Sequence, residues 1–225
     1  VVFYGGLHLE GKMGEVLERT GKRRPVVAVT EKIAEDRLLK PEAFEGAYDP
    51  HVWMDVALWM ETVRRVEETL SALDPEGAAG YRERAETYLR EVAELDAYAK
   101  RRIAEIPPES RVLVTAHDAF NYFGRAYGLE VLGLQGISTE TEAGVGDVQG
   151  LTSVLVDRRI KAIFIESSVP RRNIEAVQAA ARARGHNVGI GGELFSDAMG
   201  DAGTPEGTYI GMIRHNVDTI VNALR

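Results

Sequence analysis

The sequence predicts an α/β protein made of two βα lobes with parallel sheets, joined by one long, rigid backbone helix. Short β-branched runs alternate with amphipathic segments along the 225 residues, which is typical of parallel strands separated by helices. Residues 75–106 carry a single amphipathic stripe that is longer than a small lobe is wide. We therefore expect residues 1–74 to be the remainder of an N-terminal lobe, 75–106 the linking helix and 107–225 a C-terminal lobe.

The first lobe begins with apolar runs at residues 1–4 and 25–29, which predict two strands. A helix near residues 9–19 should lie between them. A second helix should follow Trp53 with Asp55 as its N-cap, because apolar residues then recur at about one helical turn.

The linking helix is predicted by apolar side chains at spacings of three and four, opposite a face of Arg and Glu. A helix of about 30 residues spans on the order of 45 Å, which suits an element that bridges two lobes. A coiled-coil partner helix is the alternative, but small residues interrupt the stripe. The residues of the stripe are Tyr81, Ala85, Tyr88, Leu89, Val92, Leu95, Ala99, Ile103 and Ile106.

The C-terminal lobe repeats the alternation of strands and helices. Strands are expected at 111–115, 130–134, 162–166 and 187–190, and helices at 119–127, 148–158, 172–184 and 209–224.

Composition limits the classes of partner. The formal charge of −8 and the pI near 5.3 oppose binding to nucleic acid or to anionic membrane surfaces. The chain has no cysteine, which excludes disulfides and thiolate ligands. No stretch approaches the roughly 20 apolar residues of a membrane span. The sequence starts directly with a strand-like run, which indicates a mature or truncated chain.

Polar residues stand where predicted strands and apolar runs end. His51, His117 and Asp197 each follow such a run, and Glu166 ends another strand. In open parallel sheets, ligands bind beyond the carboxyl ends of the strands. Imidazole and carboxylate groups are ligands for zinc, manganese or iron, so these residues are candidates for a metal site.

Each candidate also has a purely structural interpretation. His51 could pack beside Trp53, and His117 could enter a helix beside Asp118 as N-cap. Asp197 could serve a turn. We expect Glu166 to orient a histidine and not to bind the metal directly. The remaining histidines receive the structural interpretation: His8, His186 and His215.

Five motifs, taken in order, resemble the cluster A-I substrate-binding proteins of bacterial ABC transporters, the ZnuA/TroA/PsaA-like family. They are Tyr4-Gly5-Gly6-Leu7-His8-Leu9-Glu10, Asp49-Pro50-His51-Val52-Trp53, Thr115-Ala116-His117-Asp118-Ala119-Phe120-Asn121-Tyr122-Phe123, Gly136-Ile137-Ser138-Thr139-Glu140-Thr141-Glu142-Ala143 and Phe164-Ile165-Glu166-Ser167-Ser168. The resemblance covers essentially the whole chain. It implies a TroA-like receptor with a helical backbone and a metal site between its lobes.

The same resemblance assigns three metal ligands: His51, His117 and Asp197. A fourth, a His in a Pro-His segment, is expected upstream of Val1, so the site of the printed sequence should be weakened or open. The ion would be Zn²⁺ or Mn²⁺, one per chain, with Fe²⁺ as a further candidate. The donor set does not decide among them, although we lean slightly to zinc.

The function implied is an extracytoplasmic receptor that delivers the metal to a membrane ABC permease. The protein would lie in the periplasm or on the extracellular face of the membrane. A lipid anchor would belong to an N-terminal segment outside the printed sequence. The alternatives are a metal-binding adhesin or, less favoured, a metal-dependent hydrolase using a metal-bound water. His117-Asp118 could be compared with the metal pair of HD-type phosphohydrolases, but those residues lie on helices, and His117 is expected to end a strand.

Overall fold

The computed structural model describes residues 1–41, 44, 46–139 and 143–225. The chain divides into two compact units, Val1–Glu94 and Leu95–Arg225. The boundary falls inside α3 (Ala78–Ile103), which matches the helix predicted from the long stripe. The division into residues 1–74, 75–106 and 107–225, with a linking helix, stays a prediction.

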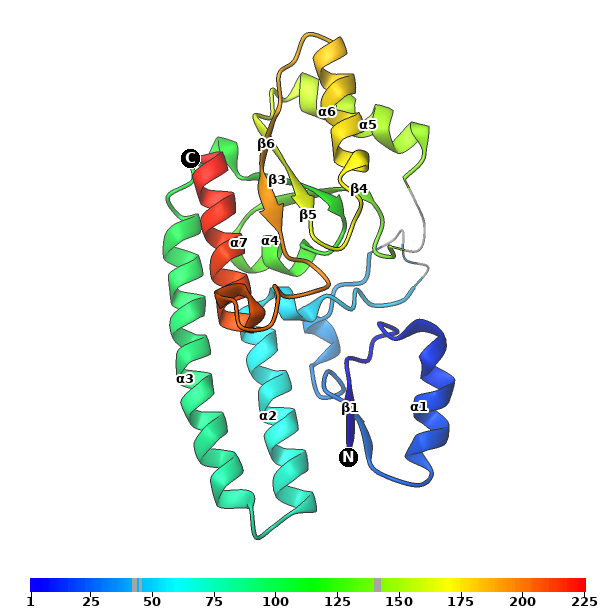
Figure 1. Cartoon of the computed structure of the whole chain (residues 1–225), viewed down its shortest axis with the longest axis vertical. Coiled ribbons are helices and arrows are strands. Elements are labelled where there is room, and N and C mark those ends of the chain that lie inside the picture. Colours follow the sequence, from blue (N-terminus) through cyan, green and yellow to red (C-terminus); the bar gives the residue numbers. More distant parts are fainter. Residues whose placement is uncertain (42–43, 45, 140–142) are drawn as a thin grey trace. The chain divides into compact units, whose positions relative to one another are not determined.

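In the first unit, β1 (Val2–Tyr4) and β2 (Val26–Ala28) pair in parallel, and α1 (Gly14–Gly21) connects them (Figure 1). The helix was expected from residue 9, but α1 begins five residues later. Leu7, His8 and Gly11 have φ angles of 54°, 66° and 49°, a left-handed conformation that a right-handed helix does not accommodate.

The helix α2 (Val56–Leu73) begins at the predicted N-cap. Asp55 Oδ1 accepts the backbone N–H groups of Ala57 at 2.9 Å and Leu58 at 3.3 Å, which confirms the cap. Further along, Trp59 Nε1 lies 3.4 Å from Tyr88 Oη and connects α2 to the first part of α3.

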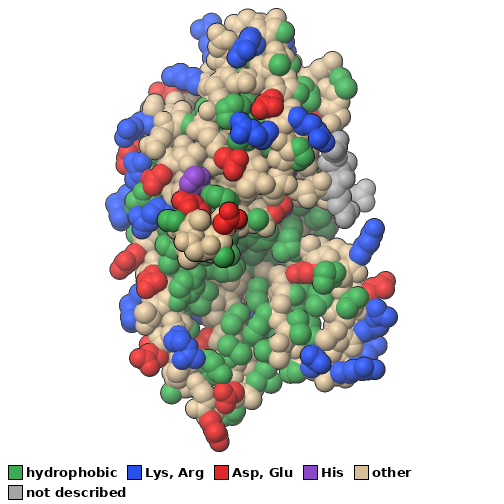
Figure 2. Space-filling view, viewed as in Figure 1, with side chains coloured by type: hydrophobic (Ala, Val, Ile, Leu, Met, Phe, Trp, Pro, Cys, Tyr) green, Lys and Arg blue, Asp and Glu red, His purple; other side chains and the backbone are tan. Residues whose placement is uncertain are grey.

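An apolar groove of about 320 Å³ is lined by residues of α2 and α3 together with Val29, which follows β2. In Figure 2, hydrophobic side chains gather on the visible face over α2 and β1.

The second unit contains two parallel strand pairs among its described residues. The strand β3 (Val112–His117) pairs with β4 (Glu130–Gln135), and β5 (Ala162–Glu166) pairs with β6 (Gly189–Leu194). Contacts between β3 and β5 bring the two pairs together. The helices are α4 (Asn121–Tyr127), α5 (Val145–Asp157), α6 (Arg172–Ala183) and α7 (Tyr209–Leu224). The predicted α/β class with parallel strands is confirmed.

Alternate side chains of the central strands enter a core shared with α5 and α6. Val114 and Ala116 of β3 and Ile163 and Ile165 of β5 belong to this core. Figure 1 shows α5 and α6 close together beside the strands, whereas α7 follows β6. A side chain at Gly191 of β6 would meet Phe164 at 2.6 Å, so only glycine fits there.

Two polar bonds tie α7 to the C-terminal part of α3 within the second unit. Asp218 Oδ1 accepts hydrogen bonds from Tyr98 Oη at 2.5 Å and from Arg102 Nε at 3.1 Å. Figure 1 shows the two helices side by side.

Short 3-10 helices complete the described elements: η1 (Gly11–Met13), η2 (Glu35–Arg37), η4 (Val52–Met54), η5 (Pro108–Ser110) and η6 (Pro205–Gly207). Among the described residues, no helix combines the length and the apolar character that crossing a membrane requires.

Candidate metal centre

His117 is the last residue of β3, and Glu166 is the last residue of β5. Both side chains are buried at the carboxyl ends of neighbouring strands. Glu166 Oε1 accepts the backbone N–H of His117 at 2.9 Å, and Glu166 Oε2 lies 2.6 Å from the ring Nδ1. This contact favours the tautomer with its proton on Nδ1 and leaves Nε2 to bind a ligand.

Asp197 follows β6 and faces the other nitrogen of the same ring. Its Oδ2 lies 3.4 Å from His117 Nε2, and its side chain is 29% exposed. The second unit therefore brings together three of the four residues predicted for the site: His117, Glu166 and Asp197. An imidazole nitrogen beside a partly exposed carboxylate is a donor pair that suits a borderline divalent cation.

The two carboxylates determine the charge of His117. Burial by itself lowers the pKa of His117, but hydrogen bonding to Asp197 and Glu166 and the negative charge of both groups outweigh it and raise the pKa to about 10. Without a metal, His117 therefore holds a proton at neutral pH. A cation that binds Nε2 has to displace that proton.

His51 belongs to the first unit and stands just before the 3-10 helix η4. Asp49 Oδ1 accepts the backbone N–H of His51 at 2.9 Å and lies 2.7 Å from its ring Nδ1. The ring also packs against Trp53, with 5.1 Å between centroids, as the structural interpretation expected. A buried carboxylate thus holds Nδ1 in His51 as it does in His117.

Asp49 was missed by the sequence analysis. Its signal was the spacing in Asp49-Pro50-His51, because an aspartate two residues before a histidine can reach both the backbone N–H and the ring of that histidine.

The alternative interpretation, with Asp118 as the N-cap of the helix after His117, does not fit the start of that helix. The helix α4 begins at Asn121 with Phe120 in the N-cap position, and Phe120 makes no side-chain capping bond. Instead, Ala119 N–H donates to His117 O at 2.9 Å, and this tight turn delays the start of the helix.

The other histidines contact main-chain oxygens or lie on the surface. His186 Nε2 is 2.7 Å from Ile160 O, and His215 Nε2 is 2.9 Å from Glu193 O. His8 is exposed and has the left-handed φ noted above. In the motif Gly136–Ala143, residues 140–142 lie outside the described residues.

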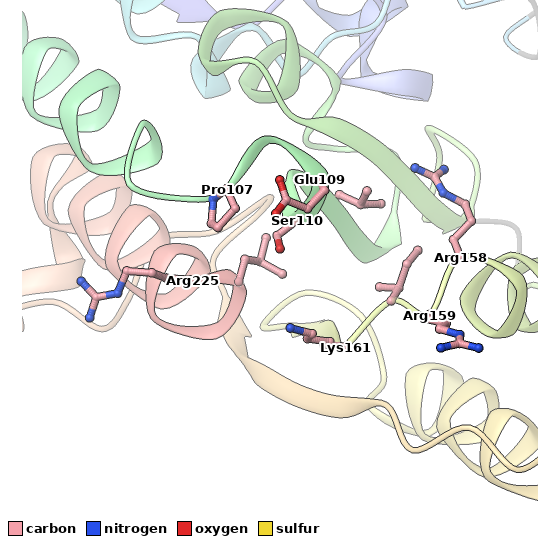
Figure 3. Close-up of a pocket in the computed structure, with 10 residues that line it drawn as sticks. Pro107, Glu109, Ser110, Arg158, Arg159, Lys161 and Arg225 are labelled. Atoms are coloured by element: carbon pink, nitrogen blue, oxygen red, sulfur yellow. The ribbon is translucent and has the colours of Figure 1, made fainter.

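A separate pocket of about 370 Å³ lies near the opposite ends of the strands in the second unit, where β3 and β5 begin (Figure 3). Four of its ten lining residues are basic and one is acidic, Glu109; the basic ones are Arg158, Arg159, Lys161 and Arg225. Arg158 also binds both carboxylate oxygens of Glu130 at 2.6 Å. Since positive side chains repel a divalent cation, this pocket is not a candidate for the metal.

Residues 1–223 match the protein family described as zinc-uptake complex component A, periplasmic. The chain belongs to this family. The family match confirms the resemblance that the five motifs indicated. The zinc-uptake component A family consists of metal-binding transport receptors.

The whole chain aligns with most of the length of two individual relatives. The chain is 54% identical to the zinc-binding protein TroA of Treponema pallidum (strain Nichols), over all of this chain and 72% of the relative. It is 48% identical to the manganese-binding lipoprotein MntA of Bacillus subtilis (strain 168), over all of this chain and 73% of the relative.

A solved structure of the periplasmic zinc-binding protein TroA from Treponema pallidum superposes with a TM-score of 0.96 at 55% identity. The superposition covers 99% of this chain and 79% of that one.

Proposed function

We propose that this protein is an extracytoplasmic receptor that binds one divalent transition-metal ion, zinc or manganese, and delivers it to a membrane ABC permease. The ligands would be His51 from the first unit and His117 and Asp197 from the second. The proposal is supported above all by the contact of His117 with two carboxylates, which fixes Nδ1 and leaves Nε2 beside Asp197.

The arrangement at His51 supports the same role. Asp49 holds its Nδ1, so Nε2 of this ring is also the nitrogen that could bind a metal. In this proposal Asp49 and Glu166 orient the two rings, and neither binds the ion directly. Two imidazoles and one carboxylate accommodate zinc and manganese alike. The relatives are named for both ions, so the donor set leaves the preferred ion to measurement.

The proposed activity is capture and release without chemical turnover. Membership of a family of transport receptors supports this view, and it favours the receptor over a hydrolase. The location, periplasmic or on the outer face of the membrane, rests on relatives named as periplasmic proteins or lipoproteins.

Metal titration tests the proposal. The full-length protein, freed of metal by a chelator, is titrated with Zn²⁺ and, in parallel, with Mn²⁺ against a competing indicator. We expect one ion per chain. The variant His117→Ala should lose more than the roughly 10–100-fold that removal of an outer partner costs.

His8→Asn is the matched control, because His8 is an exposed histidine and asparagine tolerates its left-handed φ. Its affinity should equal that of the unaltered protein. Equal affinities for His117→Ala and the unaltered protein would refute the assignment of His117 as a ligand.

A further inference from the structure

One buried amide side chain holds the segment that leads to Asp197. Asn216 of α7 is fully buried. Its Oδ1 accepts the backbone N–H of Phe195 at 2.9 Å, and its Nδ2 donates to the backbone oxygen of Phe195 at 2.7 Å. An amide that uses both its donor and its acceptor on the main chain of one residue fixes the orientation of that residue's backbone as well as its distance. Phe195 lies two residues before Asp197.

Other contacts reinforce this attachment from both sides of Phe195. His215, the neighbour of Asn216 on α7, bonds to Glu193 O at 2.9 Å, and its ring meets the ring of Phe195 at 5.0 Å between centroids. Ser196 Oγ lies 2.6 Å from Ser168 Oγ, which belongs to the loop after β5. The backbone is therefore held up to the residue before Asp197, whereas the Asp197 side chain itself stays partly exposed.

We propose that Asn216 is a positioning residue for the metal, acting through Asp197. The inference rests on the proposed function, in which the Asp197 carboxylate is a ligand. A ligand on a loop binds tightly only if the loop already holds it near the bound position, because otherwise binding must order the loop. The Asn216 amide supplies this order from a regular helix that contributes no ligand itself.

A merely structural role for Asn216 would give a different result. Loss of its two hydrogen bonds removes a partner from the N–H and from the C=O of the half-buried Phe195, which lowers stability whether or not a metal binds. The effect on metal affinity must therefore depend on the presence of the Asp197 carboxylate. A double-mutant cycle measures that dependence directly.

The test uses the full-length protein and Zn²⁺ alone, in competition with an indicator. We compare the unaltered protein, Asn216→Ala, Asp197→Ala and the double variant. Asn216→Ala should bind Zn²⁺ roughly tenfold more weakly, at the lower end of the losses seen for outer partners of metal ligands. Added to Asp197→Ala, the same change should cause no further loss. The control is Asn222→Ala, an exposed asparagine on the same helix, which should leave affinity unchanged.

Thermal unfolding of each metal-free variant shows that it folds, and hydrogen exchange at the Phe195 amide should be faster in Asn216→Ala. If Asn216→Ala does not fold, Asn216→Asp replaces it, since that variant keeps an acceptor for the Phe195 N–H but loses the donor to the Phe195 oxygen. An unchanged Zn²⁺ affinity, or equal losses with and without Asp197, would overturn the inference alone. Failure of the unaltered protein to bind Zn²⁺ would overturn the proposed function as well.

Discussion

Glu166 binds His117 with both of its carboxylate oxygens, one on the backbone N–H at 2.9 Å and one at 2.6 Å from the ring Nδ1. The two contacts use the two oxygens for different purposes, since only the second selects the tautomer of the ring. Asp49 contacts His51 in the same two places but with a single oxygen, Oδ1. This difference in geometry leads to different expectations for the two carboxylates.

Replacing Glu166 by glutamine should weaken metal binding roughly 10–100-fold. In the glutamine variant, the amide oxygen can still accept the hydrogen bond from the backbone N–H of His117. The NH₂ group then faces Nδ1 and donates to it, so Nδ1 has to be a hydrogen-bond acceptor. The proton then moves to Nε2, which can no longer bind a metal. Zn²⁺ titration measures the loss, with Glu193→Gln, an exposed glutamate of β6, as control. An affinity equal to that of the control would contradict this account of Glu166.

Replacing Asp49 by asparagine should have a smaller effect, less than about tenfold, because one amide oxygen can keep both contacts that Oδ1 makes. Asp49→Ala removes both contacts and should cost roughly 10–100-fold. The same titration compares the two variants, with Asp36→Asn as an exposed control. If the asparagine and alanine variants lose affinity equally, charge and not geometry determines the contribution of Asp49.

The stability of the metal-free protein should fall as the pH rises above neutrality. The pKa of His117 is about 10 in the folded protein, against roughly 6.5 in an unfolded chain. A raised pKa stabilises the folded state fully below pH ~6.5, and this contribution is lost as the pH approaches ~10. Urea unfolding across that range should show the decline, and His117→Gln should lack it. A parallel decline in both proteins would assign the effect to other groups.

Removing the cap of α2 should destabilise the first unit by about 1 kcal/mol. In Asp55→Ala, the N–H groups of Ala57 and Leu58 lose their acceptor. Asp55→Ser keeps an accepting oxygen and should retain most of the stability. Urea unfolding, followed by the fluorescence of Trp59 on α2, measures both variants. A full loss in the serine variant would show that the charge, and not the cap, stabilises the helix.

Periodicity and local chemistry predicted the elements whose causes lie within a few residues. The stripe of α3 and the cap at Asp55 are of this kind, and the structure bears out both. Periodicity could not reveal the left-handed backbone at Leu7 and His8, which delays α1, because non-glycine residues seldom adopt it.

The end of β6 was misjudged for a related reason. The strand was expected at residues 187–190. In the structure β6 spans Gly189–Leu194, and Gly191 lies inside the strand at a position where Phe164 and Ala223 leave no room for a side chain. Such a contact joins residues far apart in the chain and has no local signature.

The residues of the candidate site also differ in whether the sequence around them carries a signal. His51, His117, Asp197 and Glu166 could be found because each follows an apolar run or ends a strand. Asn216 could not, because it lies in the middle of an amphipathic helix, where an asparagine carries no signal of its own. Only the tertiary structure shows which peptide it binds.

The helix α7 carries two residues with different contacts. Asn216 binds the segment before Asp197, and Asp218 binds Tyr98 and Arg102 of α3. The helix α7 thus contacts both the backbone before the proposed ligand Asp197 and the C-terminal part of α3, the longest described helix. Tyr98 and Arg102 are remote in sequence from every candidate ligand, yet they contact the helix that also holds the segment before Asp197. The contacts between α7 and α3 are therefore a place where a substitution would act on the support of the proposed ligand and leave the ligands themselves unchanged.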